Sequence, residues 1–128
     1  MCSFANHNPT GYHNAGAVGN GLYEQDVNYQ VGIYLYNLLN NDYRFVARVS
    51  RPSPYTVLGT NTATSLAERV RMANEWPADY FISIHANSNP NPNINGAEMY
   101  IYQFNTQANW LAQHIMNGIV NNTALGNN

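Results

Sequence analysis

One stretch of the sequence, residues 78–87, constrains the fold more than any other. It reads Ala-Asp-Tyr-Phe-Ile-Ser-Ile-His-Ala-Asn, and its aromatic and β-branched side chains predict a strand that is buried on both faces. Residues 87–95, rich in Asn and Pro, cannot continue a regular element. His85 is therefore expected where a buried strand meets a loop, which is the edge where open α/β sheets bind ligands. The alternative is a histidine that is hydrogen-bonded within the core.

The rest of the chain alternates between strand-like and helix-like segments. Apolar residues recur at helical spacing in three places, and Ser65 and Glu68 have the spacing of a capping box at the start of the second. The order β-α-β-α-β-β-α predicts one α/β domain, residues 1–128, with a mostly parallel twisted sheet flanked by helices. The predicted strands are residues 2–6, 43–49, 79–85 and 97–104. The first predicted helix runs from about residues 22–26 to 40, the second from about 65 to 76, and the third from about 106 to 120.

The composition narrows the classes of partner. Charged residues make up only 9% of the chain, there is no lysine, and the formal net charge is −2. We therefore expect no basic surface for nucleic acid or for an anionic membrane. No apolar run approaches the roughly 20 residues that a membrane helix needs. The single cysteine, Cys2, excludes an internal disulfide and a cysteine-based zinc site, and no hydrophobic leader precedes it, so no signal peptide is expected.

Two histidines and one carboxylate are expected at the same edge of the sheet. His7 and His85 each follow directly on a predicted strand, and Glu24 opens the helix that returns from the loop after His7. If the two strands are parallel, all three side chains lie at that edge. Two imidazoles and one carboxylate, with a fourth position open, are typical of a catalytic zinc site. Their spacing along the chain is not diagnostic, because only the fold can bring them together.

Five segments resemble, in order, the zinc-dependent N-acetylmuramoyl-L-alanine amidases of the Amidase_3 family. The first resembles that family's metal-binding loop and helix start, and the fourth resembles its most recognisable segment. The last, Gly-Ala-Glu-Met-Tyr, resembles the family's Gly-Val-Glu-Thr-Tyr. The matches span nearly the whole chain and are highly specific when taken together. They are residues 15–28, 48–51, 65–70 with 73–74, 78–87 and 96–100.

The resemblance implies a hydrolase that cuts the amide between the lactyl group of N-acetylmuramic acid and L-alanine in peptidoglycan. One Zn²⁺ ion would activate the attacking water, with His7, Glu24 and His85 as its ligands. The start of the chain departs from the family, because Asn-His-Asn-Pro at residues 6–9 stands where the family has Asp-Pro-Gly-His-Gly-Gly. The loop that follows is also longer, which leaves His13 as a rival first ligand. We favour His7, because it ends the predicted first strand directly.

A second departure lies at the C-terminal end. The family has two further strands after the last helix, and the final strand carries a glutamate that acts as general base or acid. We expect that segment to be missing from this chain. Glu98 is then the acidic residue left as a candidate catalytic group. The alternative, which we favour, is a strand residue that is hydrogen-bonded to a neighbouring loop. A sheet without its last strands would also expose an edge through which the chain could self-associate.

Peptidoglycan is the expected partner under this resemblance. The expected place of action is the bacterial cell wall, reached by secretion or as a phage endolysin released from the cytoplasm. Two other functions stay open. One is a zinc peptidase that acts on peptidoglycan with the same types of ligand, and the other is a catalytically weak fragment that binds the cell wall.

Overall fold

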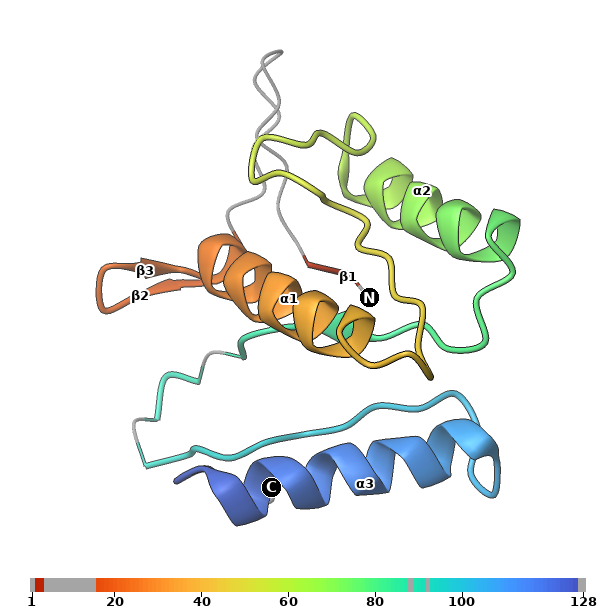
Figure 1. The fold of residues 1–128 in the computed structure, drawn as a ribbon. Coiled ribbons are helices and arrows are strands. Elements are labelled where there is room, and N and C mark those ends of the chain that lie inside the picture. The colour runs from red at the N-terminus through yellow and green to blue at the C-terminus, as the bar shows by residue number, and fades with distance from the viewer. Residues whose placement is uncertain (1, 4–15, 88, 92, 127–128) are drawn as a thin grey trace. The chain divides into compact units, whose positions relative to one another are not determined.

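The computed structural model describes residues 2–3, 16–87, 89–91 and 93–126 (Figure 1). Two compact units divide the chain, Met1–Ser88 and Asn89–Asn128. Among the described residues, the first unit contains helices α1 (Glu24–Asn40) and α2 (Thr62–Glu75) with four short strands, and the second contains helix α3 (Gln107–Asn122). The mixture of helices and strands and the three predicted helices are therefore confirmed. In these parts of the chain, no helix has both the length and the apolar character needed to cross a membrane.

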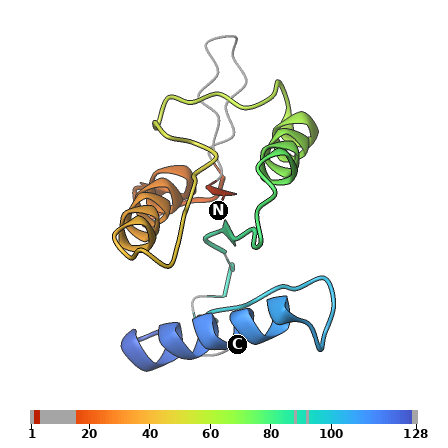
Figure 2. The ribbon, with the colours of Figure 1, turned by 45° about the vertical axis from the view of Figure 1, so that its right-hand side comes forward.

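The strand that leads to His85 has a parallel neighbour from the start of the chain. Strand β1 (Cys2–Ser3) pairs with β4 (Ser83–Ile84), so that Cys2 lies opposite Ser83 and Ser3 opposite Ile84. In Figure 2, β1 lies between α1 and α2. The two strands run in the same direction, as the sequence predicted for this pair, whereas His7 lies outside the described residues.

A tight hairpin precedes α1. Strands β2 (Val18–Gly19) and β3 (Leu22–Tyr23) are antiparallel, and the two residues that connect them are Asn20 and Gly21. Both connecting residues have positive φ angles, 51° and 74°. An Asn-Gly pair in this conformation suits the twist of a two-residue hairpin. The hairpin runs directly into α1 and so fixes the position of the first residue of that helix.

The strand predicted over residues 79–85 is shorter and more exposed than expected. Regular pairing is confined to Ser83–Ile84, and the side chains of Tyr80 and Phe81 are 43% and 45% exposed. The prediction of a strand buried on both faces is therefore wrong. A strand extends only as far as a neighbour supplies hydrogen bonds, and the described part of β1 is two residues long.

Two further predicted strands are absent from the described structure. Residues 43–49 form no ladder, and at Ala47, inside this segment, both backbone groups are bound by the side chain of Asn40. Asn40 Oδ1 accepts from the N–H of Ala47 at 2.8 Å, and its Nδ2 donates to the carbonyl of Ala47 at 3.1 Å. Residues 97–104 form no strand beyond a single bridge residue at Ala97, whose N–H donates to Gly126 O at 2.7 Å, after the end of α3. The parallel sheet predicted from four strands is reduced, among the described residues, to the β1–β4 pair.

Helix α2 begins three residues earlier than the sequence predicted. Asn61 is its N-cap and forms the capping box with Thr64: Asn61 Oδ1 accepts from Thr64 N at 2.9 Å, and Thr64 Oγ1 accepts from Asn61 N at 3.0 Å. The expected box at Ser65 and Glu68 is therefore wrong. Ser65 is buried within the first turns of the helix, where Arg69 Nη2 donates to its hydroxyl at 3.3 Å.

Replacing Asn61 with alanine should remove this cap. We expect the free energy of unfolding to fall by about 1 kcal/mol, because the N–H of Thr64 loses its acceptor. Urea denaturation followed by circular dichroism measures the change. Asn61→Asp is the matched control, since aspartate keeps the accepting oxygen and should unfold close to the parent protein. Equal stability of the alanine variant and the parent would contradict the assignment of the cap.

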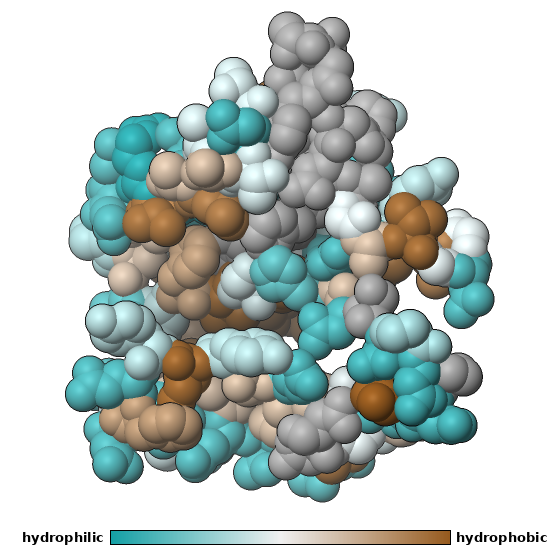
Figure 3. Space-filling model, turned by 180° about the vertical axis from the view of Figure 1, so that it is seen from behind, coloured by the Kyte–Doolittle hydropathy of each residue, from teal (hydrophilic) through white to brown (hydrophobic). Residues whose placement is uncertain are grey.

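The buried positions of the described chain are mainly polar. Leu58 is the buried hydrophobic residue among them, whereas large apolar side chains on the helices, such as Val31 on α1 and Val70 on α2, are 44% and 52% exposed. Figure 3 shows apolar side chains at the surface among polar ones. The buried polar residues are Gln25, Asn28, Ser50, Arg51, Ser65 and Arg69. Buried polar groups need partners, and Arg69 Nη1, for example, donates to Ser50 Oγ at 3.1 Å.

Candidate functional site

Glu24 is the first residue of α1, and its carboxylate joins three parts of the first unit. Oε2 accepts from the N–H of Ala17, before the hairpin, at 2.7 Å. Oε1 accepts from the N–H of Ala86, after β4, at 3.1 Å and from Nδ2 of Asn28, one turn along α1, at 3.2 Å. The backbone N–H of Glu24 also donates to Ala17 O at 2.9 Å. The side chain is only 10% exposed, so these contacts hold the carboxylate in one place.

Gly16 makes room for this carboxylate. Its φ is +67°, a backbone conformation that residues other than glycine rarely adopt. A Cβ at this position would lie 2.8 Å from Cβ and 2.9 Å from Cδ of Glu24, and would also collide with Oε2. Only glycine therefore lets the chain pass this close to the Glu24 side chain.

His85 follows β4 directly and lies next to Glu24. Its Nδ1 is 3.4 Å from Glu24 Oε1, and its side chain is 46% exposed. Its Nε2 is 3.0 Å from the hydroxyl of Ser83. Two residues that are far apart in the sequence, and that the sequence analysis had placed at one sheet edge, are therefore adjacent in the structure. The backbone N–H of Ala86, which binds Glu24, holds the end of β4 against the start of α1.

The surroundings of Glu24 favour its charged form. Burial raises the pKa of this carboxyl, but the backbone N–H groups of Ala17 and Ala86 lower it, and so do His85 and Asn28. The net effect is a pKa below the usual value for glutamate. Glu24 is thus a carboxylate at neutral pH, and a carboxylate is the form that binds a metal cation.

The donor types at this site suit zinc. A carboxylate oxygen and an imidazole nitrogen are both common zinc ligands, and a catalytic zinc site has three protein ligands. Glu24 and His85 would supply two of them, while His7 and His13, the rivals for the third, lie outside the described residues. Within the part of the chain that the structure describes, no cluster of three or more His, Cys, Asp or Glu side chains is arranged to hold a metal.

Comparison with protein families now identifies the class to which this arrangement belongs. The sequence pattern of Amidase_3, described as N-acetylmuramoyl-L-alanine amidase, matches residues 5–128. The chain belongs to the Amidase_3 family. The match covers both described residues of the site and the two histidines that compete for the third ligand position.

Similar proteins carry the same description. The Amidase_3 chain is 41% identical over 93 residues to the N-acetylmuramoyl-L-alanine amidase CwlM of Bacillus licheniformis, which is 72% of this chain and 33% of that protein. It is 41% identical over 88 residues to the sporulation-specific N-acetylmuramoyl-L-alanine amidase of Bacillus subtilis (strain 168), 68% of this chain and 31% of the relative. The amidase LytC of the same strain is 38% identical over 90 residues, 70% of this chain and 16% of LytC.

The Amidase_3 chain spans about a third of the length of the first two of these relatives. No solved structure matches it significantly.

Glu98, the candidate catalytic group from the sequence, belongs to the second unit. Its Oε2 accepts a hydrogen bond from the hydroxyl of Tyr100 at 2.6 Å, and both side chains are exposed. This bond raises the pKa of the Tyr100 hydroxyl, because loss of the proton would put a second negative charge beside the carboxylate. The bond with Tyr100 lies within the segment of Glu98 itself, and the expected bond between Glu98 and a neighbouring loop stays a prediction.

Two supporting residues were missed by the sequence analysis. Asn28 is only 2% exposed and binds Glu24, and Ser83 contacts His85. The spacing along the chain could have revealed both, since Asn28 is four residues after Glu24 and Ser83 is two residues before His85. Residues four apart share one side of a helix, and residues two apart share one face of a strand. A candidate ligand on α1, or directly after β4, therefore predicts where its supporting residue lies.

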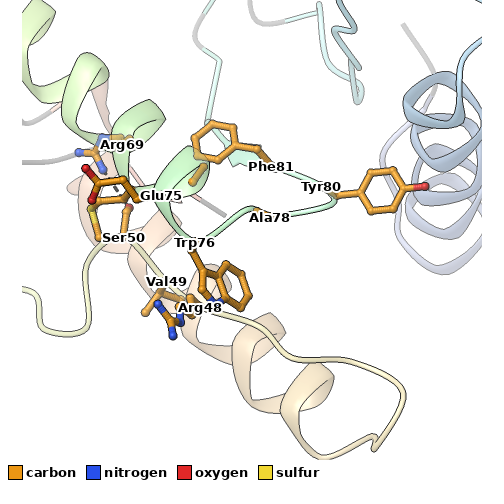
Figure 4. Close-up of a pocket in the computed structure, with 11 residues that line it drawn as sticks. Arg48, Val49, Ser50, Arg69, Glu75, Trp76, Ala78, Tyr80 and Phe81 are labelled. Atoms are coloured by element: carbon orange, nitrogen blue, oxygen red, sulfur yellow. Dashed lines mark hydrogen bonds between the residues drawn. The ribbon is translucent and has the colours of Figure 1, made fainter.

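A separate hollow in the first unit lies apart from the site. It has a volume of about 510 Å³ and is bounded by residues 48–50, one side of α2 and residues 78–81 (Figure 4). The guanidinium of Arg48 lies over the ring of Trp76, 4.6 Å from its centroid. Neither Glu24 nor His85 lines this hollow, so it is not part of the candidate metal site.

Proposed function

We propose that this Amidase_3 chain hydrolyses the amide between the lactyl group of N-acetylmuramic acid and L-alanine in peptidoglycan. The observation that carries the proposal is the contact between Glu24 and His85, 3.4 Å apart, in a chain that belongs to this family. The two residues come from the start of a helix and the end of a strand. A carboxylate held beside an imidazole at a sheet edge is an arrangement suited to binding a metal ion.

We infer that one Zn²⁺ ion is bound by His7, Glu24 and His85. When bound, zinc would polarise an amide carbonyl and lower the pKa of a water molecule, so that hydroxide is available to attack that carbonyl at neutral pH. The contacts of Glu24 support its role as a ligand, because two backbone N–H groups and Asn28 hold its carboxylate charged and in place. His85 supplies a half-exposed imidazole, which substrate can approach from solvent.

Hydrolysis also needs a group that moves a proton from the water to the leaving nitrogen of L-alanine. We propose Glu98 for this role, because it is an exposed carboxylate in residues 96–100, the segment whose sequence resembles the family's Gly-Val-Glu-Thr-Tyr. A Glu98→Gln variant that binds zinc but lyses cell walls more slowly than Tyr100→Phe would support this role.

Metal removal combined with product analysis tests the function. We expect the purified chain to contain about one zinc ion per molecule, as a catalytic site of this class does, and to lose wall lysis when a chelator removes it. Digestion should release free amino groups of L-alanine and leave the glycan strands intact. New amino groups on other residues would show a peptidase instead. Pull-down on insoluble peptidoglycan with no product would show a wall-binding fragment, and lysis that is unaffected by the chelator would contradict a metal mechanism.

Asn28 should support zinc binding through Glu24. Replacing Asn28 with alanine removes the donor to Oε1, and we expect zinc affinity to fall by about tenfold or more, as it does when other residues that orient a metal ligand are lost. Competition with a chromophoric zinc chelator measures the affinity. The control is Asn37→Ala, an exposed asparagine on the same helix, which should bind zinc like the parent. Unchanged affinity in the Asn28 variant would show that its contact is not needed.

The proposed place of action is the bacterial cell wall, with peptidoglycan as partner. Self-association through an edge of the β1–β4 pair is part of the same proposal. Among the described residues neither strand pairs with a third, and such an edge offers backbone groups to a second copy. Light scattering over a range of protein concentrations would show whether the mass rises with concentration.

A further inference from the structure

The two ring nitrogens of His85 face different partners. Nδ1 is 3.4 Å from Glu24 Oε1, and Nε2 is 3.0 Å from Ser83 Oγ. Ser83 lies two residues before His85, so the two side chains leave the backbone on the same face of the chain. This local geometry turns the imidazole so that one nitrogen is directed to the carboxylate and the other to the hydroxyl.

We propose that Ser83 is a positioning residue that makes Nδ1 the metal-binding nitrogen of His85. The inference rests on the proposed zinc site and adds to it the identity of the ligand atom and the residue that selects it. A metal ion shared by Glu24 and His85 has to lie on the side of the ring that faces Glu24, and that side carries Nδ1.

The protonation pattern of the ring follows from this choice. A neutral imidazole carries one N–H, and the nitrogen that binds a metal must be the one without a proton. The proton therefore resides on Nε2, and this N–H donates a hydrogen bond to the hydroxyl oxygen of Ser83. A hydroxyl can accept or donate, so Ser83 adapts to this state without moving its oxygen.

The effect of Ser83 on the metal would be indirect. A partner at the second nitrogen fixes both the orientation of a ligating imidazole and the position of its proton, and loss of such partners weakens metal binding by about 10–100-fold. Ser83 is exposed, and its substitution leaves no buried cavity. Its removal should therefore change metal binding while the fold is retained.

Nuclear magnetic resonance of the cadmium-substituted protein tests the ligand atom directly. The chain is labelled with ¹⁵N-histidine and loaded with ¹¹³Cd²⁺, and His85→Ala identifies the resonances of His85. We expect coupling between ¹¹³Cd and Nδ1 of His85, together with a proton on Nε2. His114 serves as an internal reference, because its Nδ1 lies 2.9 Å from the carbonyl of Trp110 on α3, and it should show no coupling.

Each other outcome has a distinct meaning. Coupling to Nε2 of His85 would overturn the inference but leave the proposed zinc site intact. Cadmium binding without coupling to His85 would overturn the inference and remove His85 from the ligand set. Failure to bind the metal at all would overturn both the inference and the proposed function.

Substitutions at Ser83 test the positioning role. We expect Ser83→Ala to lower Zn²⁺ and Cd²⁺ affinity by about tenfold or more, and Ser83→Thr to restore it, because threonine keeps the hydroxyl. In the alanine variant, the metal-free ring should also show a changed proportion of its two neutral forms in long-range ¹H–¹⁵N spectra. Equal affinity and equal proportions in the parent and the alanine variant would overturn the role of Ser83.

Discussion

Replacing Glu24 with alanine or glutamine should abolish zinc binding and wall lysis. Glutamine has nearly the shape of glutamate but no charge, and its single oxygen cannot serve the N–H groups of both Ala17 and Ala86. A catalytic zinc would contribute several kcal/mol of transition-state stabilisation, so we expect its loss to slow lysis by about a hundredfold or more. Atomic absorption on the purified variant gives the zinc content, and release of dye from labelled walls gives the rate.

Glu75→Gln is the matched control for charge. Glu75 lies at the exposed C-terminal end of α2, where it forms an ion pair with Arg71, and is 62% exposed. Losing one exposed ion pair costs little, so this variant should keep both zinc and lysis. Zinc content that is unchanged in the Glu24 variants would remove Glu24 from the ligand set, whatever the effect on lysis.

Replacing Gly16 with alanine should displace the Glu24 carboxylate without altering that residue. The new Cβ would lie within 2.9 Å of the Glu24 side chain, and the positive φ adds strain of about 1–3 kcal/mol. We expect zinc affinity to fall by about 10–100-fold, because the carboxylate can no longer keep both its backbone donors and its place beside His85. Zinc competition measures the affinity, and urea denaturation measures the accompanying loss of stability.

Gly21→Ala is the control that separates the effect of backbone strain from the effect of a steric clash with Glu24. Gly21 has a φ of +74°, close to that of Gly16, but a Cβ there would meet nothing within 4 Å. The two variants should therefore lose similar stability through backbone strain, while only Gly16→Ala loses zinc affinity. Equal zinc affinity in the two variants would show that the close approach of Gly16 to Glu24 is not what places the carboxylate.

The helices were predictable because their signals are local. Apolar spacing and the loop residues around the helices located α1, α2 and α3. The start of α2 was wrong, because the cap is Asn61 and not the predicted Ser65. The strands were less predictable, because a strand needs a neighbour. Residues 43–49 are rich in strand-forming side chains, yet the Asn40 side chain binds both backbone groups of Ala47. No pattern within that segment contains this information.

The candidate site also has a part that the sequence predicts and a part that it does not. Residue type and sequence motif were enough to select Glu24 and His85, and the structure places them side by side. The groups that hold them could not be selected in the same manner. Two of the three donors to Glu24 are backbone N–H groups, at Ala17 and Ala86, and a backbone donor leaves no mark in residue identity. The ligand roles themselves, and that of His7, remain predictions.

The contacts of Glu24 also bear on how the first unit opens. Its carboxylate is shared by Ala17 near the start of the described chain and Ala86 near the end of the unit. If either segment moves away, a charged group loses a partner in a place with little solvent. Local opening of the hairpin and release of the β4 end are therefore expected to occur together. A single side chain thus makes these two distant segments one cooperative element, independently of whether a metal is bound.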